Sequence, residues 1–527
     1  MEMDMDIIRK AIAATIFALV MAWAWRVLDW AWFTPKRIEK RLRQQGFRGN
    51  PYRFLVGDVK ESGKMHQEAL SNPMEFDNDI VPRLMPHINH TIKTYGRNSF
   101  TWMGRIPRIH VMEPELIKEV LTHSSKYQKN FDVHNPLVKF LLTGVGSFEG
   151  AKWSKHRRII SPAFTLEKLK SMLPAFAICY HDMLTKWEKL AEKEGSHEVD
   201  IFPTFDVLTS DVISKVAFGS TYDEGGKIFR LLKELMDLTI DCMRDVYIPG
   251  WSYLPTKRNK RMKEINKEIT DMLRFIINKR MKALKAGEPG EDDLLGVLLE
   301  SNIQEIQKQG NRKDGGMTIN DVIEECKLFY FAGQETTGVL LTWTTILLSK
   351  HPEWQERARE EVLQAFGKNK PEFERLNHLK YVSMILYEVL RLYPPVIDLT
   401  KIIHEDTKLG PYTIPAGTQV MLPTVMLHRE KSIWGEDAME FNPMRFADGV
   451  ANATKNNVTY LPFSWGPRVC LGQNFALLQA KLGLAMILQR FKFDVAPSYV
   501  HAPFTILTVQ PQFGSHVIYK KLERQNF

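Results

Sequence analysis

Cys470 stands in the segment of this chain whose residues are best suited to chemistry. The run Phe463–Gly472 reads F-S-W-G-P-R-V-C-L-G, so glycines lie on both sides of the cysteine and an arginine precedes it by two positions. Glycine lets the backbone approach a flat ligand closely and leaves N–H groups free to bond a sulfur. A helix that begins directly after the cysteine favours negative charge at its N-terminus, which stabilises a thiolate over a thiol. We therefore predict that these surroundings stabilise Cys470 as a thiolate, although a cysteine taken alone is usually a small buried hydrophobe.

Three further cysteines occur, and none has such surroundings: Cys179, Cys242 and Cys326. A free cysteine among apolar neighbours is usually a small buried hydrophobe, which is the prediction for all three. No C-x-x-C pair occurs, so the sequence contains neither a disulfide framework nor a common zinc motif. This cysteine usage indicates a protein that faces the reducing cytosol.

The whole chain has the composition of an ordinary globular protein, with 44% hydrophobic and 25% charged residues among 527. Its formal charge of +9 suits nucleic acid, an anionic membrane surface or an acidic partner. Basic residues gather at 36–48 and 257–263, and the first group directly follows an apolar N-terminal stretch. Since no zinc-finger or helix-turn-helix pattern accompanies the charge, a membrane surface is favoured and nucleic-acid binding is not expected.

The N-terminus carries a candidate membrane anchor, residues 1–33. Ala11–Trp25 is almost purely apolar, and with the tryptophan-rich extension that follows it reaches the ~20 residues that a membrane span needs. Acidic residues precede it and basic ones follow, so the positive-inside rule leaves the remainder in the cytosol. We predict a basic linker over 34–60 and a single catalytic domain over 61–527. The alternative, a cleaved secretory signal ending near Ala22–Ala24, suits neither the acidic start nor the cysteine usage.

The pattern of apolar residues predicts how the rest of the chain is built. Helical periodicity dominates between Lys152 and Phe366. The longest predicted helix begins at the capping pair Thr318 and Asp321 and runs to Leu348. The other predicted elements are a hairpin of Ser99–Met103 with Arg108–Val111, a loop at Gln304–Gly316, a helix at Tyr381–Arg391, a hairpin over Tyr412–Leu422, a helix at Gln473–Arg490, and strands at Phe491–Asp494 and Val517–Tyr519. Together they predict a mainly α fold with small β sheets (α+β).

The spacing F-x-x-G-x-R-x-C-x-G around Cys470 resembles the haem loop of the cytochrome P-450 family, and its five fixed positions make it a specific pattern. The resemblance implies the cytochrome P-450 fold, with the Cys470 thiolate bound to the iron of haem b. It implies a monooxygenase that takes dioxygen as a substrate and receives electrons from NADPH through NADPH-cytochrome P-450 reductase. The same resemblance places Phe463, Gly466, Arg468 and Gly472 against the haem.

Two further segments resemble the family's contacts to the haem edge. Trp153 and Arg157 form a W-x-x-x-R pattern, in which both residues share a helix face and reach the haem propionates. Lys401 stands where members of the family often carry another propionate-binding arginine. Lysine offers one point charge in place of the arginine fork, so this match is incomplete. Three neighbouring basic residues would either dock the reductase or form a solvated face: Lys152, Lys155 and Arg158.

A third motif, A-G-Q-E-T-T at Ala332–Thr337, resembles the family's oxygen-activation motif within the long helix. A mid-helix glycine costs about 1 kcal/mol, and a threonine that bonds its i−4 carbonyl tends to bend the helix. Both features suit a groove beside a haem. The resemblance makes Thr336 the donor to dioxygen and Glu335 a proton relay. Without Cys470, the same residues would indicate an ordinary buried helix.

A charged cluster is expected behind the haem loop. Glu388 and Arg391 form an E-x-x-R pattern whose two ends share one helix face. Alone, such a pair is usually solvated. Arg445, in the P-x-R-F pattern that follows, resembles the residue that completes the Glu-Arg-Arg cluster of the family. The three residues are therefore expected to brace the cysteine loop, which is a structural role.

Over the whole chain, the resemblance is closest to the plant branch of the family that oxidises iridoids, gibberellins and other terpenoids. It implies oxidative opening of the cyclopentane ring of the iridoid glucoside loganin, in terpenoid indole alkaloid biosynthesis. Family topology implies pocket-lining residues in the segments 130–142, 328–336, 396–399 and 504–507, among them His134, Ala332, Asp398 and Phe504. Asp398 and His134 would hydrogen-bond the glucose, although such residues more often cap a turn or face solvent.

Other functions stay open at this point. A hydroxylase would act on another terpenoid, and a haem-thiolate isomerase or dehydratase would need no reductase, although the intact Glu335–Thr336 pair argues against the latter. A non-catalytic membrane scaffold would not explain four mutually consistent haem motifs. For an enzyme of this branch, the expected location is the endoplasmic reticulum membrane, with one span and a cytosolic catalytic domain. Ile248–Pro255 would either dip into the membrane lipid or form a packed surface turn.

Overall fold

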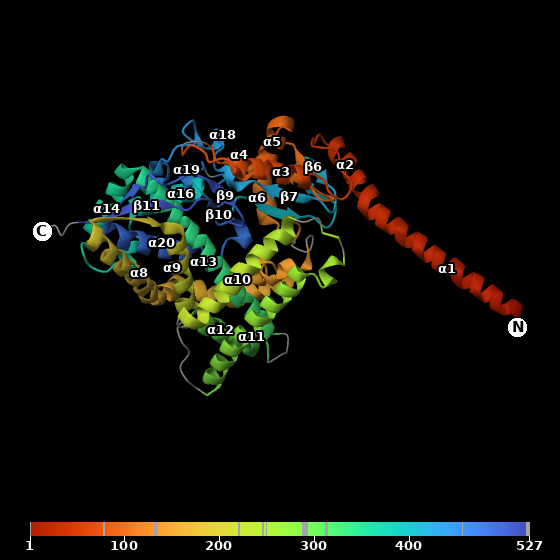
Figure 1. The fold of residues 1–527 in the computed structure, drawn as a ribbon, viewed down its shortest axis with the longest axis horizontal. Helices are drawn as coiled ribbons and strands as arrows, with labels where there is room; N and C mark the ends of the chain where they lie inside the picture. The colour runs from red at the N-terminus through yellow and green to blue at the C-terminus, as the bar shows by residue number, and fades with distance from the viewer. Residues whose placement is uncertain are drawn as a thin grey trace.

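A single long helix, α13 (Ile319–Lys350), crosses the middle of the molecule (Figure 1). Thr318 and Asp321 form the predicted capping box at its start: the Asp321 N–H donates to Thr318 Oγ1 at 3.1 Å, and the Thr318 N–H donates to Asp321 Oδ2 at 3.0 Å. Pro352 begins the next helix, α14 (Pro352–Phe366), because proline is tolerated in a first helical turn but not inside a helix. The predicted extent of α13 is confirmed.

The computed structural model describes residues 2–76, 79–129, 135–219, 222–244, 247–248, 250–286, 293–310, 315–455 and 457–522. The larger helices that pack with α13 are α9 (Ile201–Phe218), α10 (Tyr222–Arg244), α11 (Lys257–Lys285), α16 (Lys380–Leu392) and α20 (Gln473–Leu488). Two further helices, α8 (Leu166–Glu194) and α12 (Leu294–Lys308), pack against α9. α9 comes especially close to α13: a Cβ on Gly333 would stand 2.9 Å from Ile213 Cδ1. The mid-helix glycine thus allows contact with α9, which the sequence did not predict.

The strands in the described ranges form one four-stranded sheet and three smaller ones. The larger sheet has the order β1-β2-β7-β4, made of β1 (Phe100–Met103), β2 (Ile106–His110), β7 (Gln419–Leu422) and β4 (Leu399–Ile402). Its β2 and β7 are parallel, and its other neighbours are antiparallel. A second sheet has the order β3-β11-β8, made of β3 (Ser196–Asp200), β11 (His516–Lys521) and β8 (Phe491–Val495). The first predicted hairpin and the two predicted C-terminal strands are therefore confirmed.

The predicted hairpin over Tyr412–Leu422 is wrong. Strand β6 (Tyr412–Ile414) pairs with β5 (Thr407–Leu409), which precedes it, while β7 joins the larger sheet. Gly410 has φ of +55°, and this left-handed backbone permits a tight turn between β5 and β6. Residues 415–417 therefore connect two sheets and do not close a hairpin.

The predicted loop at Gln304–Gly316 is wrong in its first part, because α12 continues to Lys308. Asn302, inside α12, fixes the chain that returns after the helix: its Nδ2 donates to Met317 O at 3.0 Å, and its Oδ1 accepts the Met317 N–H at 2.7 Å. The polar residues near 304–308 thus form the solvent-facing end of a helix. Residues 311–314 lie outside the described part of the chain.

The N-terminal helix projects away from the body of the molecule (Figure 1). α1 (Glu2–Leu28) continues through a π-helical turn, η1 (Asp29–Phe33), into α2 (Thr34–Gln44). Among the described residues, this is the one helix that is long and apolar enough to cross a membrane, with a mean hydropathy of 1.9 in a window that is 0% buried. A membrane anchor fits this helix, whereas the first part of the expected linker is helical.

The π-helical turn η1 is held against the body of the molecule. The Tyr52 hydroxyl donates to the Ala31 carbonyl at 2.6 Å. The Arg105 guanidinium lies over the Trp30 ring, 4.5 Å from its centroid. A π turn displaces carbonyl groups from the α-helical hydrogen-bond pattern, so a donor from outside the helix stabilises it. Tyr52 supplies that donor, and it fixes where the projecting helix leaves the body.

Two hydrophobic clusters form the core of the described residues. The larger one is built from helices and includes Trp343, whereas the smaller one lies on the four-stranded sheet and includes Trp102. The segment that leads to Cys470 connects them, because Leu461 belongs to the smaller cluster and Phe463 packs against the larger. The cysteine loop therefore lies where the helical and sheet-rich parts of the molecule meet.

Candidate functional site

The loop that carries Cys470 is closed by its own backbone. The Cys470 N–H donates to the Phe463 carbonyl at 2.8 Å. Gly466 has φ of +73°, and a Cβ at this position would stand 2.9 Å from the backbone oxygen of Leu121 in α6 (Pro114–Thr122). Both the left-handed backbone and this close approach call for glycine. Gly466 therefore sets the path of the chain just before the cysteine.

The sulfur of Cys470 faces an internal space. Its side chain keeps accessible surface although it lies deep among protein atoms. The Gly472 N–H donates to the sulfur, immediately before α20 begins. Burial raises the pKa of the Cys470 thiol, whereas the Gly472 hydrogen bond and the cations of Lys129 and Arg157 lower it. A thiolate here has an N–H donor and two nearby cations, which favour it as a metal ligand.

Arg468 and Arg157 both lie next to the chain that leads to Cys470. The Arg468 guanidinium stands 4.0 Å from the centroid of the Trp153 ring and forms an ion pair with Glu149. Arg157, in α7 (Gly150–Ile160), donates to the backbone oxygen of Val469 at 2.9 Å. The structure thus brings the W-x-x-x-R pattern and the cysteine loop together.

Two lysines complete a group of cations around Glu149. Lys401, in β4, is 4% exposed, and its ammonium group makes no hydrogen bond or ion pair with a described residue. Burial, together with the cations of Lys129 and Arg468, lowers the pKa of Lys401 to about 7. The Lys129 N–H donates to Glu149 Oε1 at 2.6 Å, and burial and Arg468 lower the pKa of the Lys129 side chain. Lys129, Arg157, Lys401 and Arg468 are called the cationic cluster below.

The cationic cluster fits the two carboxylates of a haem. Among the described residues, the carboxylate of Glu149 acts on three of the four cations, those of Lys129, Lys401 and Arg468, so the cationic cluster carries excess positive charge. The Nε of Arg468 is buried without a hydrogen-bond partner. Two propionates would supply the missing negative charge and acceptors. The sequence analysis did not identify Lys129 or Glu149, because neither belongs to any of the sequence patterns around the predicted haem site.

Glu335 and Thr336 are neighbours on α13 but have different partners. Thr336 Oγ1 donates to the Ala332 carbonyl at 2.8 Å, which is the expected bond to the i−4 position. Glu335 Oε1 accepts a hydrogen bond from Thr508 Oγ1 at 2.6 Å and another from Gln510 Nε2. The sequence patterns gave no indication of Thr508 or Gln510, which lie far from the motif along the chain.

The carboxyl group of Glu335 is buried and electrostatically perturbed. Burial raises its pKa, and the hydrogen bonds from Thr508 and Gln510 act in the opposite direction. Of the nearby charges, Asp206 raises the pKa and Lys233 lowers it. A carboxyl group whose pKa lies above its ordinary range can hold and release a proton closer to neutral pH. This is the property that a proton relay requires.

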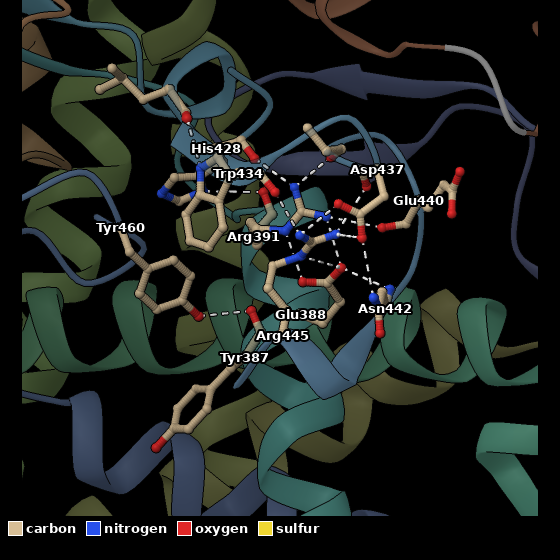
Figure 2. Close-up of polar contacts among 12 residues, drawn as sticks. Tyr387, Glu388, Arg391, His428, Trp434, Asp437, Glu440, Asn442, Arg445 and Tyr460 are labelled. Carbon is tan, nitrogen blue, oxygen red and sulfur yellow. Dashed lines mark hydrogen bonds and ion pairs between the residues drawn. The ribbon is translucent and has the colours of Figure 1, made fainter. Parts of the chain in front are cut away.

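Glu388 and Arg391 form a fully buried ion pair in α16 (Figure 2). The guanidinium is bidentate, with Nε 2.8 Å from Oε2 and Nη2 2.7 Å from Oε1, and both side chains are 0% exposed. Its other N–H groups donate to the backbone oxygens of His428, Ala438 and Glu440. All five donors of Arg391 are therefore used, which limits the cost of burying its charge.

Arg445 contacts this pair but is held mainly by Asp437 (Figure 2). Its Nε stands 3.7 Å from Glu388 Oε1, whereas its Nη2 donates to Asp437 Oδ2 at 2.8 Å. The short 3-10 helix η6 (Pro443–Phe446) carries it. The structure thus brings Glu388, Arg391 and Arg445 together and adds Asp437, to which no sequence pattern pointed.

His428 connects the buried ion pair to the cysteine loop. The Leu461 N–H donates to His428 Nε2 at 2.9 Å, and His428 Nδ1 lies 3.1 Å from the Arg391 carbonyl (Figure 2). Burial lowers the pKa of His428 to about 3, so the ring is neutral and can accept at Nε2 while it donates at Nδ1. The chain that enters the cysteine loop is therefore held from behind.

The residues expected to line a substrate pocket are only partly described. His134 lies outside the described residues, and three others are half-buried: Ala332, Asp398 and Phe504. Burial raises the pKa of Asp398, while the Arg108 guanidinium and a hydrogen bond from Thr400 lower it. Thr400 Oγ1 donates to Asp398 Oδ1 at 2.8 Å. Asp398 thus lies directly before β4 and has a polar neighbour in β4 and a cation from β2.

The three basic residues considered for reductase docking all have partners within the chain. Lys152 pairs with Asp321 at 2.8 Å, Lys155 donates to the Gly316 carbonyl at 2.9 Å, and Arg158 pairs with Glu305 at 2.6 Å. These contacts join α7 to the ends of α12 and α13. A reductase that used these cations would have to compete with the internal partners.

The segment Ile248–Pro255 exposes three apolar side chains. Trp251 is 52% exposed, Tyr253 83% and Leu254 48%. Pro249 lies outside the described residues. A packed surface turn would bury at least part of this apolar surface, so the exposure favours contact with lipid over the packed alternative.

Comparison with known proteins identifies relatives along nearly the whole chain. The sequence model of the family described as cytochrome P-450 matches residues 83–512. Secologanin synthase 1 of Catharanthus roseus is 98% identical over 99% of this chain and 100% of its own length. 7-deoxyloganic acid hydroxylase of the same plant is 55% identical over 98% of this chain and 100% of its own length. A cytochrome P-450 of Panax ginseng is 54% identical over the same shares.

Proposed function

Since the chain belongs to the cytochrome P-450 family, we propose that it opens the cyclopentane ring of loganin to give secologanin. Membership makes the protein a monooxygenase with haem as its cofactor. The proposal that loganin is the substrate rests on the 98% identity to secologanin synthase 1 over nearly the whole length of both chains. At 55% identity the Catharanthus hydroxylase bears the name of a different iridoid reaction, so membership of the family alone does not select loganin.

The proposed reaction balances with one dioxygen and one NADPH. Ring opening turns the cyclopentanol of loganin into an aldehyde and an alkene, which removes two hydrogen atoms and adds no oxygen. NADPH supplies a further two electrons, and one proton comes from NADPH and one from water. Together with the hydrogens from loganin they reduce dioxygen to two water molecules. The product is therefore lighter than loganin by two hydrogens.

The haem would be held by Cys470 and by the cationic cluster. Cys470 would bind the iron as a thiolate, and the cationic cluster would bind the propionates. Phe463, Gly466 and Gly472 would shape the loop against the ring. When bound, the haem supplies the activation of dioxygen that oxidises an unactivated carbon, for which amino-acid side chains have no chemistry of their own.

Two side chains of α13 would control protons at the site. The raised pKa of Glu335 supports a role in which its carboxyl group takes up a proton and passes it on. Thr336 donates to the Ala332 carbonyl, and its hydroxyl oxygen retains lone pairs that can accept the next proton. A haem-thiolate isomerase or dehydratase would need no such pair, so these residues favour the oxygen-dependent reaction.

The proposed setting is the endoplasmic reticulum membrane, with one span and a cytosolic catalytic domain. The apolar N-terminal helix and the basic residues that follow it support this orientation. Electrons would come from NADPH through NADPH-cytochrome P-450 reductase, and the exposed side chains near Trp251 would rest on the lipid of the same membrane. A cleaved secretory signal would remove the only helix of the described residues that fits a span.

A second candidate is the hydroxylation of another iridoid or terpenoid, which the 55% identity to 7-deoxyloganic acid hydroxylase favours. Such a reaction would use the same haem, electrons and proton relay. It differs in the product, because hydroxylation adds one oxygen atom to the substrate. Mass spectrometry therefore separates the two candidates directly.

The proposed function is tested with microsomes that contain the protein and its reductase. We expect loganin, incubated with NADPH in air, to give a product lighter by two hydrogens, and no product without NADPH or dioxygen. 7-deoxyloganic acid and other iridoid glucosides serve as competing substrates. Unchanged loganin together with an oxygen-enriched product from another glucoside would overturn the substrate and leave the monooxygenase class in place. Product formation without dioxygen would show that this reaction is not that of a monooxygenase.

We expect Asp398→Asn to weaken the binding of loganin roughly tenfold, because a hydrogen bond to a charged group contributes about 1.5–3 kcal/mol. The change keeps the size of the side chain and removes its charge. The spectral shift of the haem on titration with loganin measures the affinity, and turnover at saturating loganin should change less than the affinity. Thr400→Val, which removes the neighbour of Asp398 and no glucose contact, is the matched control. Equal affinities of the Asp398→Asn variant and the unaltered protein would contradict glucose recognition by Asp398.

A further inference from the structure

Glu335 is held by a hairpin from the far C-terminal part of the chain. The hairpin consists of β9 (Pro503–Thr505) and β10 (Val509–Pro511), which pair antiparallel. Thr508, in its turn, and Gln510, in β10, both donate to the same carboxyl oxygen, Oε1. Thr508 is 3% exposed and Gln510 is 7% exposed, so water does not compete strongly for these bonds. The hairpin therefore fixes one oxygen of the carboxyl group.

The other oxygen of this carboxyl group has a different environment. Glu335 Oε2 accepts no hydrogen bond from any residue that the structure describes, and it is not among the side-chain atoms that are buried without a partner. It therefore keeps accessible surface inside the protein. A carboxyl group fixed at one oxygen can carry a proton on the other without turning.

The hairpin is also tied to α13 and to the segment before β4. The Trp343 indole N–H donates to the Val509 carbonyl at 2.7 Å. The Val509 N–H donates to the Pro395 carbonyl at 3.2 Å, three residues before Asp398. The same hairpin carries residues 504–507, which are half-buried and were expected to line the pocket. A ligand that presses on this turn would thus act on the strand that holds Glu335.

The charged neighbours of Glu335 belong to α9 and α10 and not to the hairpin. Gln334 Nε2 donates to Asp206 Oδ1 in α9 at 2.7 Å, and Lys233 of α10 stands 3.5 Å from Asp206 Oδ2. The Lys233 side chain is 63% exposed, whereas that of Asp206 is 20% exposed. Polar contacts therefore link the exposed Lys233 through Asp206 to Gln334, the residue before Glu335, whereas the carboxyl group of Glu335 is held by the hairpin.

We infer that Thr508 and Gln510 are positioning residues, which fix Glu335 Oε1 so that Oε2 carries the proton and which tie this carboxyl group to the pocket hairpin. The inference rests on the proposed role of Glu335 and Thr336 in proton delivery. If the carboxyl group is not fixed, protons arrive from the wrong position, and dioxygen leaves as hydrogen peroxide: dioxygen, NADPH and one proton then give hydrogen peroxide and oxidised NADP. The substrate stays unoxidised in that side reaction.

The first test counts hydrogen peroxide and product against NADPH consumed. We expect Gln510→Met and Thr508→Val each to raise the peroxide released per NADPH roughly threefold or more, because each removes one donor to Oε1. Thr508→Ser keeps a hydroxyl group and should restore the ratio. Thr418→Val is the matched control, since the Thr418 hydroxyl is buried without a hydrogen-bond partner and Thr418 lies outside the segments expected to line the pocket. Whatever it does to turnover, its peroxide ratio should stay unchanged.

The second test does not depend on turnover. The native pKa of Glu335 is raised, so the carboxylate form costs stability as pH rises from the ordinary range of a glutamate through the native pKa. The hydrogen bonds from Thr508 and Gln510 stabilise the carboxylate and so reduce this loss of stability. Of the nearby charges, Asp206 increases the loss and Lys233 reduces it. Gln510→Met should therefore lower Tm more at pH 8 than at pH 5, whereas Thr418→Val should change Tm equally at both pH values.

Glu335→Gln and Thr336→Ala separate this inference from the proposed function. If neither raises the peroxide ratio, the proposed proton role is wrong and this inference falls with it. If both raise it, but Gln510→Met and Thr508→Val give the ratio of the unaltered protein and a Tm loss that is independent of pH, the positioning role alone is wrong. A raised ratio in all four variants, restored by Thr508→Ser, supports the inference.

Discussion

Replacing Cys470 by serine is expected to abolish the red-shifted carbon monoxide band of the reduced protein and essentially all turnover of loganin. The band reports a thiolate bound to haem iron, and a serine hydroxyl is a harder and much less acidic ligand. The surroundings at Cys470 are suited to sulfur, with the Gly472 N–H and the cations of Lys129 and Arg157 directed at it. The reduced carbon monoxide difference spectrum of purified protein measures the outcome.

Cys179→Ala provides the matched control for this experiment. Cys179 lies in α8 and is 6% exposed, and burial raises the pKa of its thiol, so it is an inert apolar side chain. Its replacement should leave the band in place at a modest cost in stability. Circular dichroism of the Cys470→Ser variant should show the helical content of the unaltered protein. An intact red-shifted band in that variant would overturn the assignment of Cys470 as ligand.

Glu388→Gln is expected to lower the free energy of unfolding by about 3–5 kcal/mol, because it leaves the Arg391 guanidinium buried without its counter-ion. The change keeps the shape of the side chain, so the loss reports charge and not packing. The cysteine loop should loosen as well, since His428 joins the backbone of Arg391 to Leu461. Urea titration followed by circular dichroism and by haem absorption measures both effects.

The exposed pair of Arg41 and Asp406 offers a control of the same chemistry. Its guanidinium is also bidentate, with Nη2 2.6 Å from Oδ2 and Nη1 3.2 Å from Oδ1, but the two side chains are 42% and 50% exposed. Asp406→Asn should therefore cost no more than about 1 kcal/mol. Equal losses in Asp406→Asn and Glu388→Gln would show that burial of the Glu388 pair does not determine its contribution.

Local patterns in the sequence predicted elements whose ends are set by nearby residues. The capping box at Thr318 and Asp321 is one example, because its two hydrogen bonds join residues three positions apart. The E-x-x-R pattern is another, since Glu388 and Arg391 share one face of α16 whatever surrounds them. The resemblance to the cytochrome P-450 family then placed these local elements around a common haem, which no local pattern does.

Contacts between distant segments could not be predicted in this way. Lys129 precedes a stretch outside the described residues. It joins the cationic cluster because Gln128 pairs with Ile402 of β4 and the Lys129 N–H donates to Glu149. Thr508 and Gln510 donate to Glu335 from a hairpin that is far from α13 in the sequence, so no local spacing could predict these contacts. The predicted hairpin at Tyr412–Leu422 was wrong for the same reason. Strand β7 pairs with β2 and β4, which are distant from it in the sequence, and the choice of strand partners depends on the whole sheet.

The π-helical turn has a practical consequence for work with shortened versions of the chain. Cutting before Asp29 removes the apolar α1 and keeps the Ala31 carbonyl for the Tyr52 hydroxyl, and Trp30 for Arg105. Cutting after Phe33, at the boundary that hydropathy alone suggests, leaves the Tyr52 hydroxyl without this acceptor and uncovers part of the smaller hydrophobic cluster. A soluble version of the chain should therefore begin at Asp29, inside the helix, and not after Phe33, where the apolar stretch ends.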